Sequence, residues 1–410
     1  MQKNHKKINQ KVLLIVLGIL IAIGPLTIDV YLPAFLNISQ NLQTNINKVQ
    51  HTLTSYFIGI VIGQIIFGPI IDRYGKKIPL IFGLVLFIIT SLGCAIIKDI
   101  DQMIYLRFLQ AIAGCSSIVI CRAIVRDVFL AHETAKAFSR LILVMGLAPI
   151  LAPFIGNLIL VNFNWRYIFV FLAFYALICL ILAIYLIPET KGFDHNEKIH
   201  HALKKYYRIL QDRNFLVNAL CGSMMMGCLM SYMTSSPFLY LQYFQTSSTT
   251  YSILFSLNAI GFLICSQVNH YFLKKYRVEV LINKIILLPL ISGILLILLG
   301  FIGNQLVLTT IVIFSLVAIC GAINPNTSAL ALMNQAKHTG SASAMFGTIQ
   351  FISASIFSSL ANYFHHQGNI LPLTIVIGSS GILCFVIQKF NHLQQRKNNR
   401  KTIDLDISSS

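Results

Sequence analysis

Few residues of this chain can carry charge chemistry, and two of them stand apart because they interrupt apolar runs. Asp29 lies inside the apolar stretch 12–36, and Arg107 lies a few residues into the stretch 102–125. A charged side chain at the centre of a bilayer costs about 2.5–3.5 kcal/mol on insertion scales, so it normally faces a polar cavity or a partner. The two positions therefore predict a buried pair of opposite charge.

Asp29 is predicted to carry a proton. Withdrawal from water disfavours the charged form of a carboxyl group, so such a group can exchange a proton. Arg107 stays protonated, so it can pair with Asp29 when the carboxyl is ionised and be released when it is protonated. The alternative is that Asp29 sits at the outer end of its helix, near Pro33, and caps the loop that follows.

Two segments of the second half are predicted to contact a substrate. Residues 222–233 contain five methionines, whose flexible side chains can repack around varied apolar ligands, although ordinary helix packing would also explain them. The Asn-Pro-Asn at 324–326 resembles a broken helix at a binding site, since proline frees backbone carbonyls. The substrate-cavity candidates are Tyr31, Gln110, Met225, Met226, Tyr232, Asn324 and Asn326.

Other chemistries find no support in the sequence. The nine cysteines all fall in apolar runs and none forms a CxxC pair, so we interpret them as small packing residues. The sequence contains no HExxH, no nucleotide-binding loop and no nucleophile–base set. We therefore expect no metal, no cofactor and no enzymatic activity, with an ion gradient as the energy source.

The elements that must position these residues are long apolar helices. The chain has 410 residues, of which 56% are hydrophobic and 11% charged, and apolar runs recur along its whole length. Since every backbone amide must be paired internally in hydrocarbon, each run predicts a spanning helix, the first of them uncleaved. The sequence predicts an all-α membrane protein with twelve transmembrane helices, at residues 12–36, 49–70, 78–98, 102–125, 135–161, 167–187, 214–238, 250–270, 281–302, 305–330, 340–363 and 370–390.

The charge distribution predicts the orientation of these helices. The chain has 31 lysines and arginines against 13 acidic residues. Most of these basic residues fall on one side of the predicted spans. The exceptions are Lys48, Lys98, Arg107 and Arg166. This positive-inside bias predicts that both termini are cytoplasmic. The basic charge then reflects topology, so nucleic acid is not an expected partner. The basic tail can touch anionic lipid or simply be solvated.

A polar break at 188–213 divides the predicted spans into six before and six after. It predicts an N-terminal six-helix bundle at 1–187, a cytoplasmic linker at 188–213, a C-terminal bundle at 214–390 and a cytoplasmic tail at 391–410. Two six-helix halves joined in this way resemble the layout of the major facilitator fold, in which the substrate site lies between repeats.

The segment G-P-I-I-D-R-Y-G-K-K at 68–77 resembles the loop 2–3 signature of the major facilitator superfamily. The matching residues are Gly68, Asp72, Arg73, Gly75, Lys76 and Lys77. By physical chemistry, Gly68 would let helix 2 approach a neighbour, and Asp72 would face the positive end of another helix, with helix 11 the candidate. The resemblance implies a conformational latch that favours the outward-open state. A plain basic turn is the alternative.

Helix 5 carries G-L-A-P-I-L-A-P-F-I-G-N at 146–157, which resembles the glycine- and proline-rich motif of antiporter branches. Its matching residues are Gly146, Pro149, Pro153 and Gly156, while Asn157 replaces a glycine, and a structural kink alone is the alternative. Its L-A-P-I-L-A-P (147–153), together with T-I-D-V-Y-L-P-A (27–34), R-F-L-Q-A (107–111), A-I-V-R-D (123–127) and N-W-R-Y-I-F (164–169), resembles the Bcr/CflA branch of drug:proton antiporters, associated with bicyclomycin and chloramphenicol resistance.

These observations predict a drug:proton antiporter of the bacterial inner membrane that exports small, partly apolar molecules as a monomer, with protons, substrate and membrane lipid as its partners. Two further transport functions stay open. The first is export of an endogenous metabolite, such as a siderophore, an amino acid or a small peptide. The second is proton-coupled uptake, which the helix 5 motif disfavours.

Overall fold

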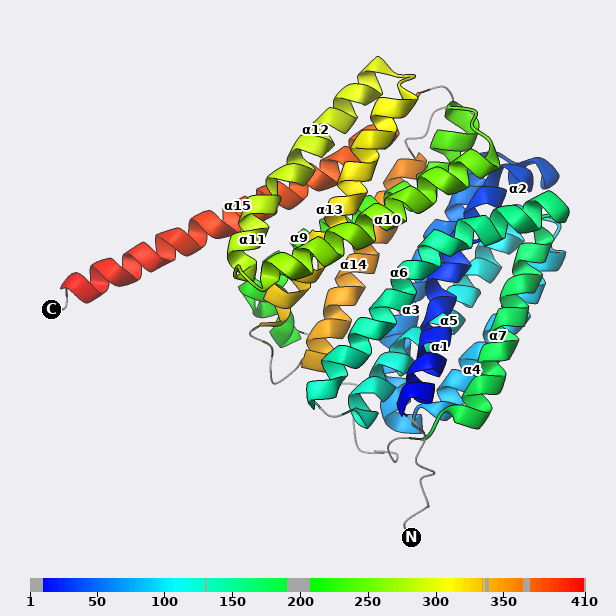
Figure 1. The fold of residues 1–410 in the computed structure, drawn as a ribbon, viewed down its shortest axis with the longest axis horizontal. Coiled ribbons are helices and arrows are strands. Elements are labelled where there is room, and N and C mark those ends of the chain that lie inside the picture. The colour runs from blue at the N-terminus through cyan, green and yellow to red at the C-terminus, as the bar shows by residue number, and fades with distance from the viewer. Residues whose placement is uncertain are drawn as a thin grey trace, which may run out of the picture. The chain divides into compact units, whose positions relative to one another are not determined.

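The fold is all-helical, as the sequence predicts (Figure 1). The computed structural model describes residues 10–129, 131–189, 207–333, 335, 339–363 and 369–408. Within these ranges some side chains are not described, among them that of Asp72.

The first part of the chain forms a series of helices that end near the predicted polar break. They are α1 (Gln10–Asp29), η1 (a short 3-10 turn, Leu32–Ala34), α2 (Phe35–Asn41), α3 (Ile46–Tyr74), α4 (Lys77–Ile96), α5 (Ile100–Val128), α6 (Ala131–Asn162) and α7 (Arg166–Leu186). The bounds of α3 follow from local chemistry. The Asn45 side chain accepts a hydrogen bond from the Lys48 amide, a typical N-cap, and Gly75 ends the helix with φ +76°.

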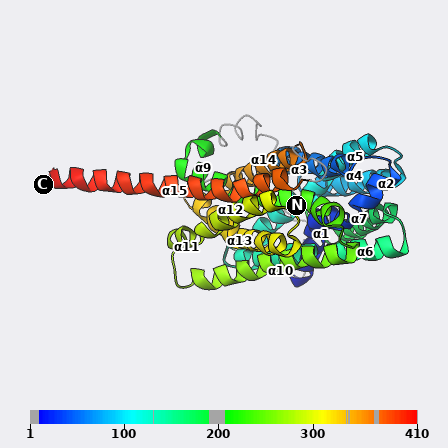
Figure 2. The same ribbon diagram turned by 90° about the horizontal axis from the view of Figure 1, so that it is seen from above.

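The second part begins at Arg213. Its helices are α9 (Arg213–Pro237), η2 (a π-helical segment, Phe238–Tyr243), α10 (Ser248–Leu273), α11 (Val278–Ile285), α12 (Leu287–Ile302), α13 (Leu306–Leu332), α14 (Thr339–Tyr363) and α15 (Leu371–Ser408). The last of these continues as a helix well past the predicted span, and its C-terminal end extends beyond the neighbouring α12 and α13 (Figure 2).

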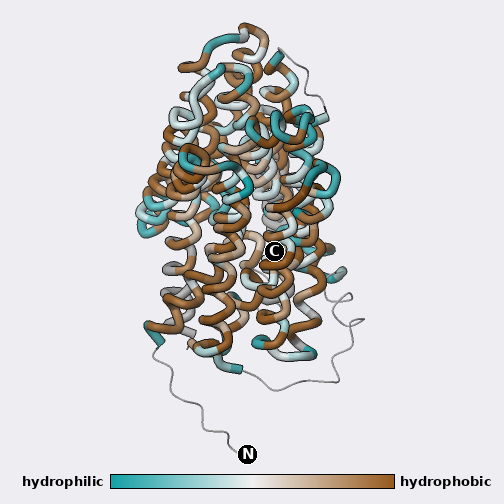
Figure 3. The backbone as a smooth tube through the Cα atoms, turned by 90° about the vertical axis from the view of Figure 1, so that its right-hand side faces the viewer, coloured by the Kyte–Doolittle hydropathy of each residue, from teal (hydrophilic) through white to brown (hydrophobic). Residues whose placement is uncertain are grey.

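Each of the twelve predicted spans coincides with helical structure, although some of them contain more than one helix. Within the described part of the chain, eleven helical segments are long and apolar enough to cross a membrane. The first of these combines α1, η1 and α2 in Gln10–Asn41, and another combines α11 and α12 in Val278–Ile302. The remaining predicted span, 340–363, corresponds to α14, which is not among the eleven. The hydropathy colouring shows mainly apolar residues along the helices (Figure 3).

The helices form two compact units. One unit contains Met1–His201 and Met233–Ala259, and the other contains Ala202–Tyr232 and Ile260–Ser410. The helices α9 and α10 therefore contribute to both. Most of the predicted linker, from 190 to 206, lies outside the described residues, so the predicted domain boundaries stay predictions.

In the first unit, α3 packs along α5, α4 packs on α5 and α7, and α1 packs along α6. The α3–α5 contact is close because Gly59 and Gly63 have no side chains. A Cβ at Gly59 would lie 2.5 Å from the Phe108 carbonyl oxygen, and one at Gly63 would lie 2.7 Å from the Cys115 Cβ. Small residues of this kind let helix backbones approach each other in membranes.

In the second unit, α12 packs along α15 and α13, and one glycine lies on another between α12 and α15. A Cβ at Gly378 would lie 2.5 Å from the Gly293 carbonyl oxygen. A buried apolar cluster joins the start of α9 and the segment before it to the C-terminal end of α13 and the N-terminal end of α14. It consists of Ile209, Phe215, Ala219, Ala331, Ala342 and Phe346.

Candidate functional site

Asp29 is the last residue of α1 and is fully buried. Its helix ends there because the chain turns into η1, which has Pro33 in its first turn. Neither carboxylate oxygen of Asp29 has a hydrogen-bond partner among the described residues. The structure therefore bears out one part of the alternative, since Asp29 lies at the end of its helix near Pro33. The cap itself, which would accept a backbone amide, is not seen among the described residues.

Arg107 projects from α5 and is also fully buried. Its Nη1 donates to the Gln110 Oε1 at 2.6 Å, and its Nη2 donates to the Thr27 carbonyl oxygen at 3.0 Å. Gln110 in turn donates to the Ser91 hydroxyl at 2.6 Å. The Arg107 Nε has no partner among the described residues. The guanidinium is thus held by neutral acceptors, and one of its donors stays unused.

Aromatic rings surround the Arg107 guanidinium. Its central carbon lies 4.7 Å from the ring centre of Tyr31, 4.5 Å from that of Tyr56 and 5.8 Å from that of Phe169. Such rings attract a cation, and the attraction is stronger where water is excluded. The Trp165 ring meets Phe169 edge-on, at 6.2 Å between centres, and the Arg166 guanidinium lies 4.4 Å from the Trp165 ring centre. We call Asp29, Arg107, Tyr31, Tyr56 and Gln110 the buried charge cluster.

Asp29 and Arg107 are linked through residues that they share, although no ion pair joins them in the described structure. Arg107 bonds to the backbone of Thr27, two residues before Asp29. The Tyr56 hydroxyl interacts electrostatically with both charged residues. The predicted pairing of the two charges stays a prediction.

Two tyrosines that the sequence analysis missed belong to the same unit. Tyr251 of α10 is fully buried, its hydroxyl lies 3.1 Å from the Ser236 hydroxyl, and it interacts electrostatically with Asp29. The ring centres of Tyr251 and Tyr240 are 6.2 Å apart. A tyrosine in an apolar run has no distinguishing pattern, so the sequence held no signal for either residue.

The predicted antiporter motif lies in α6, where Pro149 and Pro153 occupy the helix interior. It contacts the first half of α10 through polar groups. The Ser252 hydroxyl donates to the Pro153 carbonyl oxygen at 3.3 Å, and the Ser256 hydroxyl donates to the Ile150 carbonyl oxygen at 2.8 Å. One turn away, the Asn157 Nδ2 donates to the Thr249 Oγ1 at 3.3 Å. Gly146 opens this motif, and Gly156 lies against α1.

Two acidic residues bind the predicted latch. The Lys76 ammonium forms an ion pair with Asp127 at the end of α5. Beyond α7, Glu189 accepts the backbone amide of Lys76 at 2.8 Å and that of Lys77 at 3.2 Å. Because Gly75 has no side chain, the carboxylate can approach, since a Cβ there would lie 2.6 Å from Glu189 Oε1. The latch signature itself gave no hint of Glu189.

Three other latch residues have different outcomes. The central guanidinium carbon of Arg73 lies 5.3 Å from the ring centre of Tyr74. The expected close approach at Gly68 is not found, because nothing from elsewhere in the described chain lies within 4 Å of a Cβ built there. The Asp72 side chain lies outside the described residues, so its predicted contact with helix 11 stays a prediction.

The substrate-cavity candidates fall into two groups. Tyr31 and Gln110 are in the buried charge cluster. The others are in the second unit: Met225, Met226, Tyr232, Asn324 and Asn326. Met225 is fully buried, as packing requires. Asn326 exchanges two hydrogen bonds with Asn269, at 3.0 and 2.9 Å, and Asn324 accepts one from Gln350 at 3.4 Å. Their contact with a substrate stays a prediction.

A bundle of long apolar helices with a buried charge cluster defines a multi-pass membrane protein of a transporter fold. The Major Facilitator Superfamily matches residues 17–358, and the chain belongs to this family. The predicted family and fold class are therefore confirmed. Because the members of this family are transporters, the chain is assigned to transport rather than catalysis.

Two relatives and one solved structure are similar to the chain. It is 32% identical over 371 residues to the uncharacterized MFS-type transporter YdgK of Bacillus subtilis, covering 88% of this chain and 92% of the relative. It is 27% identical over 351 residues to a bicyclomycin resistance protein homolog of Haemophilus influenzae, covering 85% and 88%. The crystal structure of a D-xylose-proton symporter superposes with a TM-score of 0.71 at 15% identity, covering 92% of this chain and 97% of the symporter, and shows the fold alone.

The predicted branch agrees with these relatives. A further one is the multidrug resistance protein MdtL of Salmonella paratyphi C, 24% identical over 371 residues and covering 90% of this chain and 92% of the relative.

Proposed function

We propose that this protein is a proton-coupled exporter of small, partly apolar molecules across the bacterial inner membrane. It would work as a single chain with both termini in the cytoplasm. The observation that carries the proposal is the buried carboxyl of Asp29, which has no hydrogen-bond partner among the described residues, together with an Arg107 that donates to neutral acceptors.

The coupling step follows from electrostatics. A buried carboxylate without a partner carries a large desolvation cost, which a proton removes. When Asp29 loses its proton, the carboxylate becomes a stronger acceptor for Arg107 than the neutral Thr27 carbonyl oxygen, because opposite full charges attract each other strongly where water is excluded. Proton loss would therefore move the guanidinium from Thr27 toward Asp29. The rings of Tyr31 and Tyr56 would shift with it, since they contact the guanidinium.

Export needs two alternating arrangements of the spans. The hydroxyls of Ser252 and Ser256 in α10, bonded to carbonyl oxygens of α6, offer contacts that can open and close without leaving a charge unpaired. The latch offers a second contact, which differs because opening it would separate the Lys76–Asp127 ion pair. The names of the relatives, a bicyclomycin resistance protein homolog and a multidrug resistance protein, support drug-like substrates.

Substrate-triggered proton release from the purified protein tests the proposal. The wild type and Asp29→Asn would be compared with chloramphenicol, bicyclomycin, a siderophore and amino acids. We expect release from the wild type with a drug-like compound and none from Asp29→Asn. The control is Asp101→Asn, whose carboxylate is exposed in the first turn of α5 and should release protons like the wild type.

Each outcome of this experiment has a defined meaning. Equal release from wild type and Asp29→Asn would overturn the role of Asp29. Release with only the siderophore or an amino acid would favour export of an endogenous metabolite. Uptake of protons on substrate addition would contradict antiport.

A further inference from the structure

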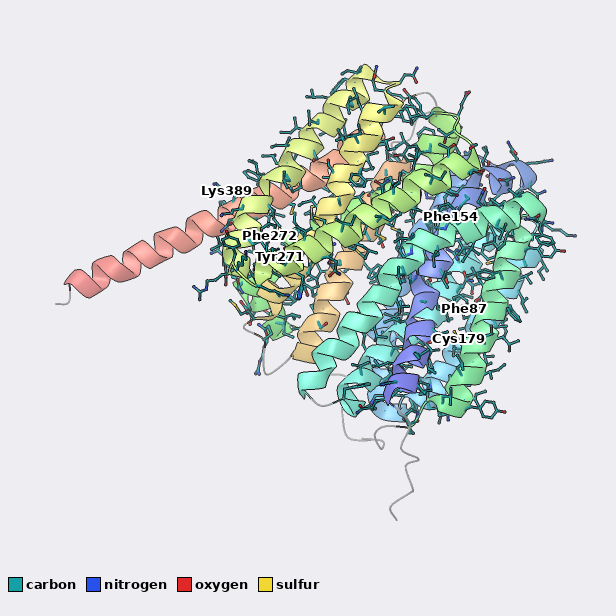
Figure 4. The ribbon with its side chains drawn as sticks, viewed as in Figure 1. Phe87, Phe154, Cys179, Tyr271, Phe272 and Lys389 are labelled. Atoms are coloured by element: carbon teal, nitrogen blue, oxygen red, sulfur yellow. The ribbon has the colours of Figure 1, made fainter. Side chains whose placement is uncertain are left out.

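The turn between α10 and α11 presents three aromatic rings to the surroundings. Tyr271, Phe272 and Tyr276 are 55%, 40% and 45% exposed. Their rings follow one another, with 6.0 Å between the centres of Tyr271 and Phe272 and 6.3 Å between those of Phe272 and Tyr276. Figure 4 labels Tyr271 and Phe272 at this end of α10.

A cation sits at each end of this series of rings. The Lys275 ammonium lies 5.3 Å from the ring centre of Tyr271, and the Lys284 ammonium lies 5.0 Å from that of Tyr276. We call Tyr271, Phe272, Lys275, Tyr276 and Lys284 the ring–lysine row. The segment 271–284 contains four basic residues and one acidic residue, Glu279. The row therefore carries an unbalanced positive charge fixed against apolar rings.

An exposed apolar stripe of α10 leads to the ring–lysine row. Ile260, Ile264 and Val268 are 37%, 59% and 47% exposed. The spacing of four residues places them on one face of the helix, and Tyr271 and Phe272 continue that face. On the other side of the row, Leu287 and Leu288 at the start of α12 are 48% and 50% exposed. The surface thus changes from aliphatic to aromatic to cationic along the helix.

This order of side chains matches the order of groups in an anionic phospholipid. Acyl chains contact aliphatic side chains, aromatic rings lie at the level of the headgroup, and lysine ammonium groups attract a phosphate. We propose that the ring–lysine row binds the headgroup of an anionic phospholipid whose acyl chains lie along Ile264 and Val268. A zwitterionic lipid would fit the apolar stripe but would gain little from Lys275 and Lys284.

Native mass spectrometry of the full chain with phosphatidylglycerol and phosphatidylcholine tests this site. The wild type is expected to retain phosphatidylglycerol in preference to phosphatidylcholine. The double variant Lys275→Gln, Lys284→Gln should bind phosphatidylglycerol at least about tenfold more weakly, because each basic group near an anionic lipid surface contributes about 1 kcal/mol. Its binding of phosphatidylcholine should not change. Raising the salt concentration should weaken only the binding of phosphatidylglycerol.

The matched control is Lys48→Gln, Lys98→Gln, which removes the same charge from two exposed positions in the other unit. It should bind phosphatidylglycerol like the wild type. Phe272→Ala should weaken the binding of both lipids, because it removes apolar surface without changing the charge. Unchanged binding of phosphatidylglycerol by the first double variant would overturn the proposal. So would an equal loss in the control, since that would reflect net charge alone.

Discussion

Gly156 of α6 faces the backbone of Val30 so closely that a Cβ at Gly156 would overlap the Val30 carbonyl oxygen. Val30 follows Asp29 directly, so this is where α6 meets the buried charge cluster. The absent side chain is what allows the two backbones to touch. The close packing leaves Asp29 buried without a partner in the described structure.

Gly156→Ala is therefore expected to destabilise the protein by about 1–3 kcal/mol, since overpacking of a filled site costs this much. Thermal unfolding in detergent measures the change. Gly68→Ala is the control, because a Cβ there meets nothing from outside its own helix within 4 Å in the described structure. Equal stability of the two variants would contradict the α1–α6 packing.

Arg107→Lys is expected to reduce transport at least about tenfold while the protein stays folded. Lysine keeps the charge but lacks the planar fork that reaches Gln110 and Thr27 together. A hydrogen bond to a charged group contributes about 1.5–3 kcal/mol. Efflux from vesicles measures the effect.

Arg166 offers a control with the same chemistry. Its guanidinium also reaches two acceptors, Asn41 Oδ1 at 2.8 Å and the Ile97 carbonyl oxygen at 3.1 Å, and lies over a ring. Arg166→Lys should leave transport near the wild-type rate. Similar losses in both variants would mean that Arg107 has no special role.

The contact between α6 and α10 is expected to open during transport. Asn157→Cys with Thr249→Cys, made in a background without the nine native cysteines, tests this by oxidative cross-linking, since the Asn157 Nδ2 and Thr249 Oγ1 atoms are 3.3 Å apart. The cross-linked protein should lose transport, and a reductant should restore it. Full transport by the cross-linked form would show that this contact does not need to open.

Glu189→Gln is expected to lower the free energy of unfolding by about 1–3 kcal/mol, because a carboxamide cannot accept both the Lys76 and Lys77 amides as a carboxylate does. Chemical unfolding measures the change. Asp101→Asn is the control. Its ion pair with Lys48 spans 3.9 Å between exposed side chains, and such pairs contribute little.

The reciprocal hydrogen bonds between Asn269 and Asn326 predict non-additive effects. Asn269→Ala or Asn326→Ala alone leaves a buried amide unpaired, at a cost of about 1–3 kcal/mol. The double variant should lower the free energy of unfolding by clearly less than the sum of the losses in the two single variants. Unfolding of all four proteins measures this. Additive losses, with transport impaired only in Asn326→Ala, would instead favour a substrate contact.

The sequence predicted the helices well because span length and apolar composition are dictated by the bilayer itself. It offered the end of the first helix at Asp29 only as an alternative, because Leu32–Ala34 is as apolar as its surroundings and only Pro33 marks the turn. The close approach expected at Gly68 has no counterpart among the described residues, since a glycine shows where a close approach is possible but not whether a neighbour is there.

The buried charge cluster was only partly predictable. Charges in apolar runs identified Asp29 and Arg107, because their cost in hydrocarbon is large. Hydrogen bonds to backbone groups carry no sequence signal, so the Thr27 carbonyl as an acceptor for Arg107 could not be foreseen. Glu189 and Tyr251 were missed for a related reason. They act on residues more than 100 positions away, and no local pattern records such contacts.

The position of Trp165 has a spectroscopic consequence. It is the only tryptophan in the chain, so all indole emission comes from this residue. Its ring meets Phe169, which contacts both Tyr31 and the Arg107 guanidinium. A movement of Arg107 therefore reaches the fluorophore through a single intervening ring. The unlabelled protein carries an intrinsic optical reporter beside its buried charges, and substrate or acid added to it can be followed by emission alone.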